Sequence, residues 1–268
     1  MIFPSHSLTR REFLSVATPL LGVGLWSPAA LGGANSGDGA LDDIPKQLLG
    51  LVNEERFVAG VPRLEMDDLA SRVASAHAID MATGNFISHW GRNGRKPYHR
   101  YSFAGGIHAT FENVASIDNV WSVEWKDLAR DLTSLHMRMH AERPPNDGHR
   151  KAILAPQQTH VGFGVAIDER KLRLVEMYVA KHLEVRDSPS RAKRKTTVEL
   201  SARLLNRNHI LQLVEVYYEP LPKPPNERFL VPVKLFKDSA GIYTIVCWIK
   251  RNAREKAFPA TEICIEAE

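Results

Sequence analysis

Three short motifs within residues 88–150 decide how this chain is interpreted: Ser88-His89-Trp90, Phe111-Glu112-Asn113-Val114-Ala115 and Gly148-His149-Arg150. Together they hold two histidines and a glutamate in distinctive contexts. Two neutral imidazoles and one carboxylate match the three-ligand set of a catalytic zinc site, which leaves one coordination position open. The same groups can also transfer protons. We therefore take His89, Glu112 and His149 as candidate catalytic and metal-binding residues.

Composition alone favours a structural role for these histidines. The chain has 11 His among 268 residues, so a His beside aromatic residues arises easily by chance. Such a residue is usually a hydrogen-bonded core or surface side chain, and a motif match needs structural context before it counts as a site. The order of further motifs along the chain shifts the interpretation toward a site.

These further motifs, in chain order, are Asn53-Glu54-Glu55-Arg56, Phe86-Ile87-Ser88-His89, Gly105-Gly106, Gly148-His149-Arg150-Lys151-Ala152-Ile153-Leu154 and Gly162-Phe163-Gly164-Val165. With the first three they resemble the CAP superfamily, also called SCP, the domain of cysteine-rich secretory and plant pathogenesis-related proteins, in its shorter bacterial form. The resemblance extends from Leu41 to Val185, roughly half of the chain. The combination is far more specific than any single motif.

The resemblance implies an α+β fold, a CAP-type α/β/α sandwich over residues 44–185, with His89, Glu112 and His149 lining a cleft. It also implies a cavity able to hold a divalent metal, zinc or magnesium. Members of this fold more often bind lipids, glycans or proteins than catalyse a known reaction. These properties are expectations for the present chain.

The fourth member of the cluster is where this chain departs from its larger relatives. Those relatives carry a second glutamate on the helix before the second histidine, which completes a set of two His and two Glu. Glu142 is the nearest glutamate before His149, only seven residues away, and we include it among the candidate metal-binding residues. Glu124 is another candidate for this position.

His136 and His140 form a rival pair, because residues four apart share one face of a helix. The segment lacks the Glu that a His-Glu-x-x-His zinc helix places after its first histidine. We therefore expect both to be solvated or locally bonded, with His140 and Glu142 kept as second-rank site residues. His77, which lies among alanines, is expected to be a buried structural histidine.

Residues 1–33 are typical of a twin-arginine signal peptide. Thr9-Arg10-Arg11-Glu12-Phe13-Leu14 carries the arginine pair, an apolar run follows from Leu14 to Trp26, and Ala29 to Gly33 supplies small residues for cleavage. The apolar run has about 13 residues, fewer than the roughly 20 of a membrane-spanning helix. We expect export by the twin-arginine machinery, a periplasmic or extracellular location, and no stable membrane span after cleavage. A flexible spacer follows over residues 34–43.

Local patterns predict the main elements of the CAP-like region. Apolar residues at helical spacing predict a helix from Pro45 that ends near Gly60. A second helix is expected from an N-cap at Asp67 or Asp68 to Gly84. Strands are expected at residues 161–167 and 172–179, and these give the sheet against which the helices pack.

Composition narrows the functional classes. With 44% hydrophobic and 25% charged residues the chain is an ordinary globular protein. A formal net charge of +4 over this length is too weak to indicate a polyanion, so no nucleic acid partner is expected. The sequence also lacks a Gly-x-Ser-x-Gly nucleophile elbow and a Gly-x-Gly-x-x-Gly nucleotide turn.

The charged run at residues 186–196 is expected to be an exposed linker. Residues 197–268 then predict a small antiparallel β-sandwich of immunoglobulin-like type. Its strands are expected at residues 198–205, 210–218, 229–236, 242–250 and 261–266. If the last two strands form a hairpin, Cys247 and Cys264 fall opposite each other. A disulfide and two buried free thiols are then the competing predictions.

Three functions are compatible with these features. The first is an exported protein that binds a lipid, glycan or protein ligand beside a divalent metal in its cleft. The second is a metal-assisted hydrolase of envelope peptides or glycans, in which the metal acidifies a bound water. The third is a structural or adhesive envelope protein that uses its β-sandwich and needs no cleft chemistry. The sequence does not decide whether the protein is an enzyme.

Overall fold

The computed structural model describes residues 43–220 and 240–268. The predicted signal peptide, most of the spacer and the predicted strand at residues 229–236 lie outside the described residues. Within the described ranges, no helix has both the length and the apolar composition needed to cross a membrane.

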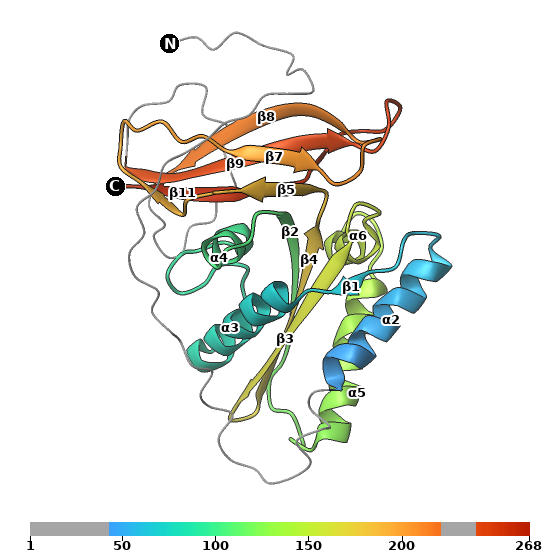
Figure 1. Cartoon of the computed structure of the whole chain (residues 1–268). Helices are drawn as coiled ribbons and strands as arrows, with labels where there is room; N and C mark the ends of the chain where they lie inside the picture. The colour runs from blue at the N-terminus through green and yellow to red at the C-terminus, as the bar shows by residue number, and fades with distance from the viewer. Residues whose placement is uncertain (1–42, 221–239) are drawn as a thin grey trace.

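A four-stranded sheet lies at the centre of the first part of the chain (Figure 1). Its strands are β1 (Glu65–Met66), β2 (Ala109–Ile117), β3 (His160–Asp168) and β4 (Lys171–Ala180). Their order is β1-β3-β4-β2, with β1 parallel to β3 and the other neighbours antiparallel. Strand β4 is buried along almost its whole length because it has a neighbour on each edge and helices on both faces. Strand β2 is left at an edge of the sheet.

Helices cover both faces of this sheet. They are α2 (Ile44–Val58), α3 (Asp68–Gly84), α4 (Pro97–Phe103), α5 (Trp125–His140) and α6 (Gly148–Leu154). Apolar residues of α2, α5 and α6 pack on one face, and those of α3 and α4 pack on the other. The result is the three-layer α/β/α arrangement that the CAP resemblance implies. The predicted limits of the first two helices are confirmed, including Asp67 as the N-cap, whose side chain accepts from the Ala70 N–H at 2.5 Å.

Two glycines in β3 explain how closely α3 approaches the sheet. A Cβ atom at Gly162 or Gly164 would collide with the α3 backbone near Ala70 and Ala74. Glycine is therefore required for this close approach. The motif Gly162-Phe163-Gly164 fixes the position of α3, and the end of α3 in turn sets where His89 lies.

Arg56 of α2 fixes the position of α6 on the other side of the sheet. Its buried guanidinium donates to the Ile153 carbonyl at 2.6 Å and the Ala155 carbonyl at 3.1 Å. These carbonyls end α6, where backbone acceptors otherwise lack partners. Because His149 is the second residue of this short helix, Arg56 also helps to place the second histidine.

The remaining strands form what we call the C-terminal module, the described residues from 183 onward. They are β5 (Leu183–Arg186), β6 (Arg191–Ala192), β7 (Ser201–Leu204), β8 (Ile210–Glu219), β9 (Gly241–Lys250), β10 (Phe258–Pro259) and β11 (Ile263–Ala267). One sheet has the order β10-β9-β11-β6 with β8 also paired to β9, and β5 pairs with β7 in a second sheet. Leu183 and Leu204 of the small sheet belong to the same core cluster as Cys247 and Ile249.

The structure corrects two predictions about this module. The predicted linker contributes β6, which pairs in parallel with β11, so the larger sheet is mixed rather than wholly antiparallel. Strand β5, which we assigned to the CAP-like region, pairs with β7 of the module. Neither strand was predicted, because charged residues in these segments obscure the alternation of apolar and polar residues. The backbone hydrogen bonds of a strand form regardless of which side chains face the solvent. The immunoglobulin-like type of the module stays a prediction.

The cysteines do not face each other. Cys264 lies opposite Thr244 in the β9–β11 ladder, whereas Cys247 pairs with Val214 of β8. Both are buried free thiols. The predicted register was wrong because β11 pairs with the first half of β9, while β10 occupies positions near its end.

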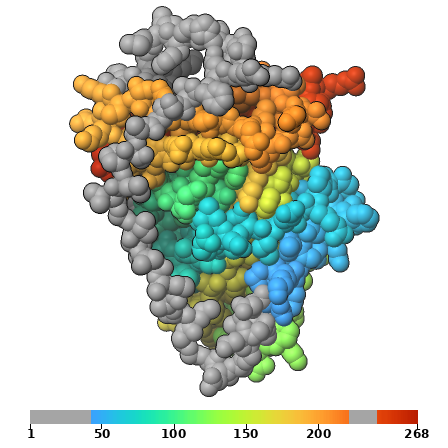
Figure 2. All heavy atoms as spheres, viewed as in Figure 1, coloured from blue at the N-terminus to red at the C-terminus, as the bar shows by residue number. Residues whose placement is uncertain are grey.

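The C-terminal module lies across one end of the α/β/α sandwich, and the two parts are in contact along that end (Figures 1 and 2). Tyr98 and Phe103 of α4 pack with Ile242 and Cys264. The Cys264 N–H also donates to the Ser102 hydroxyl at 2.8 Å. Helix α4 therefore packs directly against the module.

Candidate functional site

The four candidate residues line one open cleft of about 610 Å³, which we call the site cleft. His89 comes from the loop after α3, Glu112 from the edge strand β2, Glu142 from the turn after α5, and His149 from α6. The cleft is lined by His89, Pro97, Tyr98, Thr110, Phe111, Glu112, Asn113, Glu142, Asn146, Gly148, His149, Ala152, Pro259 and Glu262. The structure thus brings together the three motifs at which the sequence analysis began.

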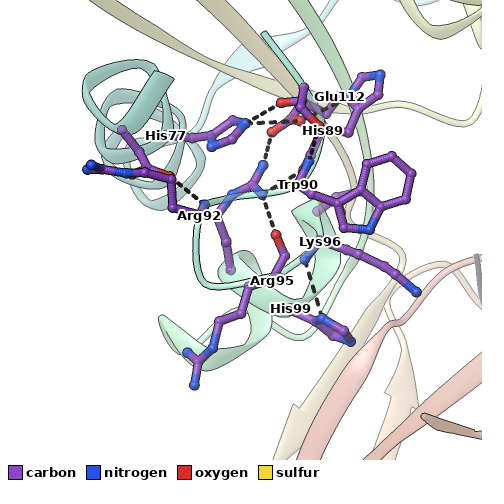
Figure 3. Close-up of polar contacts among 12 residues, drawn as sticks. His77, His89, Trp90, Arg92, Arg95, Lys96, His99 and Glu112 are labelled. Atoms are coloured by element: carbon purple, nitrogen blue, oxygen red, sulfur yellow. Dashed lines mark hydrogen bonds and ion pairs between the residues drawn. The ribbon is translucent and has the colours of Figure 1, made fainter. Parts of the chain in front are cut away.

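Glu112 is held in the wall of the cleft by ionic contacts (Figure 3). Its side chain is 1% exposed; Oε2 pairs with the Arg100 guanidinium, and Oε1 accepts from His89 Nδ1 at 3.0 Å. His77 Nε2 lies 3.9 Å from Oε1. Burial alone would raise the pKa of Glu112, but Arg100 and the His89 bond outweigh it and lower that pKa. Glu112 is therefore a fixed, ionised anchor for His89.

Arg100 also shapes the loop that presents His89. Its guanidinium donates to the His89 carbonyl at 2.8 Å and the Arg95 carbonyl at 2.9 Å. A single arginine thus joins the loop backbone to the Glu112 carboxylate. His77 is buried, as predicted, and its Nε2 lies 2.8 Å from the Ser88 carbonyl on the same loop.

The two cleft histidines share one arrangement. His89 Nδ1 bonds Glu112, and His149 Nδ1 bonds Glu142 Oε1 at 2.5 Å. The His149 N–H also donates to Glu142 Oε2 at 3.0 Å. Their side chains are 35% and 34% exposed, so both rings are open to solvent. A carboxylate on Nδ1 fixes the ring orientation and the tautomer, which leaves the Nε2 lone pair for a ligand or a metal.

This arrangement leaves few donors for a divalent metal. Both oxygens of Glu112 are engaged, so the free donors are the two Nε2 atoms, with Glu112 and Glu142 as supporting carboxylates. Among the described residues, no three His, Cys, Asp or Glu side chains are grouped as a complete ligand set. Two imidazoles suit zinc better than magnesium, which prefers oxygen ligands.

A buried polar network adjoins the cleft at Asn113 of β2. Asn113 donates to the His149 carbonyl and to Glu176 Oε2, both at 3.2 Å. Glu176 Oε1 bonds His136 Nδ1 at 2.6 Å, and Glu55 Oε2 lies 2.8 Å from His136 Nε2. Burial would lower the pKa of His136, but the two carboxylates raise it to about 10. The network is ionised and structural, and it supports the backbone of His149.

The prediction that His136 is solvated or locally bonded was therefore wrong. The ring is fully buried, and its partners come from α2 and β4. His140 contacts Glu55 Oε1 at 3.0 Å and does not line the site cleft. Glu124, the other candidate for the fourth position, is also absent from its lining. Only tertiary packing reveals Glu176 as the partner of His136.

Two lining residues, Pro259 and Glu262, come from the C-terminal module. Sequence reasoning missed both, because they lie in a region assigned to a separate β-sandwich. The site cleft is therefore composite, with a wall that the CAP-like region does not supply.

Comparison with known proteins relates the first part of the chain to one protein family. A family model described as the cysteine-rich secretory protein family, CAP, matches residues 49–180. Two relatives come from Bacillus subtilis: the uncharacterized protein YkwD is 28% identical over 120 residues, and the uncharacterized membrane protein YlbC is 31% identical over 127. The matches cover 44% and 45% of this chain, but only 41% and 31% of those proteins.

Solved structures give similar matches. An extracellular protein with an SCP domain from Bacillus anthracis is 23% identical, with a TM-score of 0.40, over 56% of this chain and 45% of that one. An outer surface protein from Borrelia burgdorferi is 18% identical, with a TM-score of 0.40, over 56% of this chain and 98% of that one.

Proposed function

Residues 49–180 form a domain of the cysteine-rich secretory protein family, CAP, and on this premise we propose an exported ligand-binding protein whose site cleft holds zinc through His89 and His149. The observation that carries the proposal is the matched geometry of the two rings. Each has its Nδ1 bonded to a glutamate, and both side chains are partly exposed and line one cleft. Zinc bound there supplies a Lewis acid next to a ligand.

Ligand binding is favoured over hydrolysis by the state of Glu112. A general base must have a lone pair within reach of the proton that it takes. Arg100 and His89 engage both oxygens of Glu112, and its lowered pKa makes it a weak base. The chain's own residues therefore bind and orient, and the ligand is of lipid, glycan or protein class.

Export is part of the proposal and rests on the twin-arginine pattern at Arg10 and Arg11. The relative YlbC is described as a membrane protein, which is compatible with a role of this family at the cell envelope. A periplasmic or extracellular location would bring the site cleft into contact with envelope components. An adhesive envelope protein, by contrast, would not need the paired imidazoles.

The test is zinc content after equilibrium dialysis of the full chain. The unaltered protein is expected to bind one zinc, and His89→Ala and His149→Ala are each expected to weaken binding at least tenfold, since each removes one of two protein donors. His160→Ala is the matched control, because His160 is partly exposed and lies outside the cleft. Equal zinc in all four proteins would overturn the proposed site.

A further inference from the structure

The C-terminal module reaches the site cleft along the start of β2. The Ala109 N–H donates to the Ala260 carbonyl at 3.2 Å, and the Glu262 N–H donates to the Ile107 carbonyl at 3.3 Å. Between them, His108 and Thr261 form an antiparallel bridge. This backbone pairing fixes Glu262 as part of the cleft wall rather than as a mobile surface residue.

Glu262 differs from the other carboxylates near the cleft, because it has no cationic partner in the described part of the chain. Its Oε2 accepts from the Thr110 N–H at 2.8 Å and from the Thr110 hydroxyl at 3.3 Å. No ion pair joins it to a described Lys, Arg or His side chain, and burial raises its pKa to about 7. Because Thr110 holds Oε2, Oε1 is the oxygen available to a bound molecule.

The other carboxylates of the cleft each have a basic side chain as a neighbour. Glu112 pairs with Arg100, and Glu142 pairs with His149. Ionised Glu262 therefore places a negative charge without a basic neighbour beside the apolar side chains of the cleft. A half-buried charge without a partner lowers the stability of the folded protein. A cation that binds in the cleft offsets this loss.

The apolar lining indicates what kind of cation fits. Phe111, Pro97 and Pro259 line the same cleft, and Phe111 is 37% exposed. An organic ammonium can pair its charge with Glu262 while its carbon skeleton covers these side chains. An ammonium group on an apolar skeleton therefore complements the cleft in both charge and surface.

We propose that Glu262 binds a primary ammonium group of the ligand, with the adjoining apolar part of that ligand against Phe111 and Pro259. This inference rests on the proposed function, since it assigns one chemical feature to the ligand of the same cleft. It also gives the C-terminal module a role in specificity: the module supplies the group that selects amine-bearing ligands. The candidate ligand class is then peptides with lysine side chains, whose ammonium stands at the end of an apolar chain.

The test uses two probes of equal shape, 2-phenylethylamine and 2-phenylethanol. Isothermal titration of the full chain at pH 8 keeps Glu262 ionised, while the amine stays protonated as a lysine side chain does. The amine is expected to bind more tightly than the alcohol, and Glu262→Gln is expected to weaken the amine at least tenfold without changing the alcohol. The Gln side chain still accepts from Thr110, so folding is preserved.

Glu268→Gln is the matched control, because it removes a charge from an exposed part of the same module and is expected to leave both probes unaffected. Equal affinity of amine and alcohol, or an unchanged amine affinity in Glu262→Gln, would overturn the inference. A loss of zinc in Glu262→Gln would also overturn it, because the carboxylate would then belong to the metal site. Loss of zinc in His149→Ala tests the proposed function separately, so the two failures are distinguishable.

Discussion

Glu219 and Glu262 are two carboxylates that the C-terminal module brings against the CAP domain, and their surroundings are opposite. Glu219, at the end of β8, pairs with the buried Lys96 ammonium, accepts from the Tyr98 hydroxyl at 2.6 Å and lies 3.3 Å from His99 Nε2. Glu262, at the site cleft, has only the backbone and hydroxyl of Thr110. One carboxylate is neutralised by its neighbours, and the other is left to be neutralised by a ligand.

The pKa directions express the same difference. Burial would raise the pKa of Glu219, but the bonds from His99, Lys96 and Tyr98 outweigh it and lower that pKa to about 2. For Glu262 nothing outweighs burial, and its pKa rises to about 7. The first group stabilises the contact between the modules, and the second carries an electrostatic cost that binding can relieve.

The largest expected effect comes from neutralising the first carboxylate. Glu219→Gln leaves the Lys96 charge buried without a counterion, so we expect a loss of about 3–5 kcal/mol in the free energy of unfolding at pH 7. Because the pKa of Glu219 is lowered, its stabilisation in the unaltered protein is present above pH 4.5 and is lost as the pH falls toward about 2. Urea denaturation of the full chain measures both effects.

Glu184→Gln serves as the control for this comparison. Glu184 pairs with Arg186 and Arg203 on the exposed surface of the same module, where ion pairs are screened by solvent. We expect little change in stability from this substitution. If Glu219→Gln also left the free energy of unfolding unchanged, the buried Lys96–Glu219 pair would not stabilise the contact between the C-terminal module and the CAP domain.

Neutralising the second carboxylate is expected to have the opposite sign. The folded-state pKa of Glu262 lies above its ordinary value of 4.5, so the unaltered protein should lose stability as the pH rises from 4.5 to about 7. The loss is at most about 3.5 kcal/mol, since one pKa unit corresponds to about 1.4 kcal/mol and the pKa rises from 4.5 to about 7. Glu262→Gln lacks this loss and should be the more stable protein at pH 8.

Thermal unfolding at pH 5 and pH 8 compares the two proteins. The difference between them should widen toward pH 8, and Glu268→Gln should behave as the unaltered protein does. The same pH slope with and without Glu262 would show that this carboxylate carries no electrostatic cost, and the contrast with Glu219 would disappear.

The sequence predicted well those features that local chemistry determines. The cap at Asp67 and the motifs around His89 and His149 each work through backbone close by in the sequence. A short pattern contains most of the information for such features. The CAP domain and its cleft histidines could therefore be anticipated from the sequence.

Features that depend on distant partners were not predictable in this way. Glu262 lies in Ala260-Thr261-Glu262-Ile263, where nothing distinguishes it from a solvent-facing strand residue. Its position in the cleft arises only when the C-terminal module pairs with the start of β2. The prediction for His136 was wrong for the same reason. Its ring pairs with Glu55 and Glu176, which lie 81 and 40 residues away in the sequence.

The smallest expected effect concerns Thr110, whose N–H and hydroxyl are the neutral groups that bond the Glu262 carboxylate. Thr110→Val removes the hydroxyl bond of 3.3 Å but keeps the backbone bond of 2.8 Å and most of the side-chain volume. A net hydrogen bond contributes about 0.5–1.5 kcal/mol, and this long one should lie at the lower end of that range. Because the hydroxyl stabilises the ionised form, its loss should raise the pKa of Glu262 slightly further, which carbon-detected NMR titration of the carboxyl group measures.

A fall in that pKa, or a loss of stability as large as that of Glu219→Gln, would mean that Thr110 does more than position the carboxylate. The two carboxylates would then differ in degree rather than in kind.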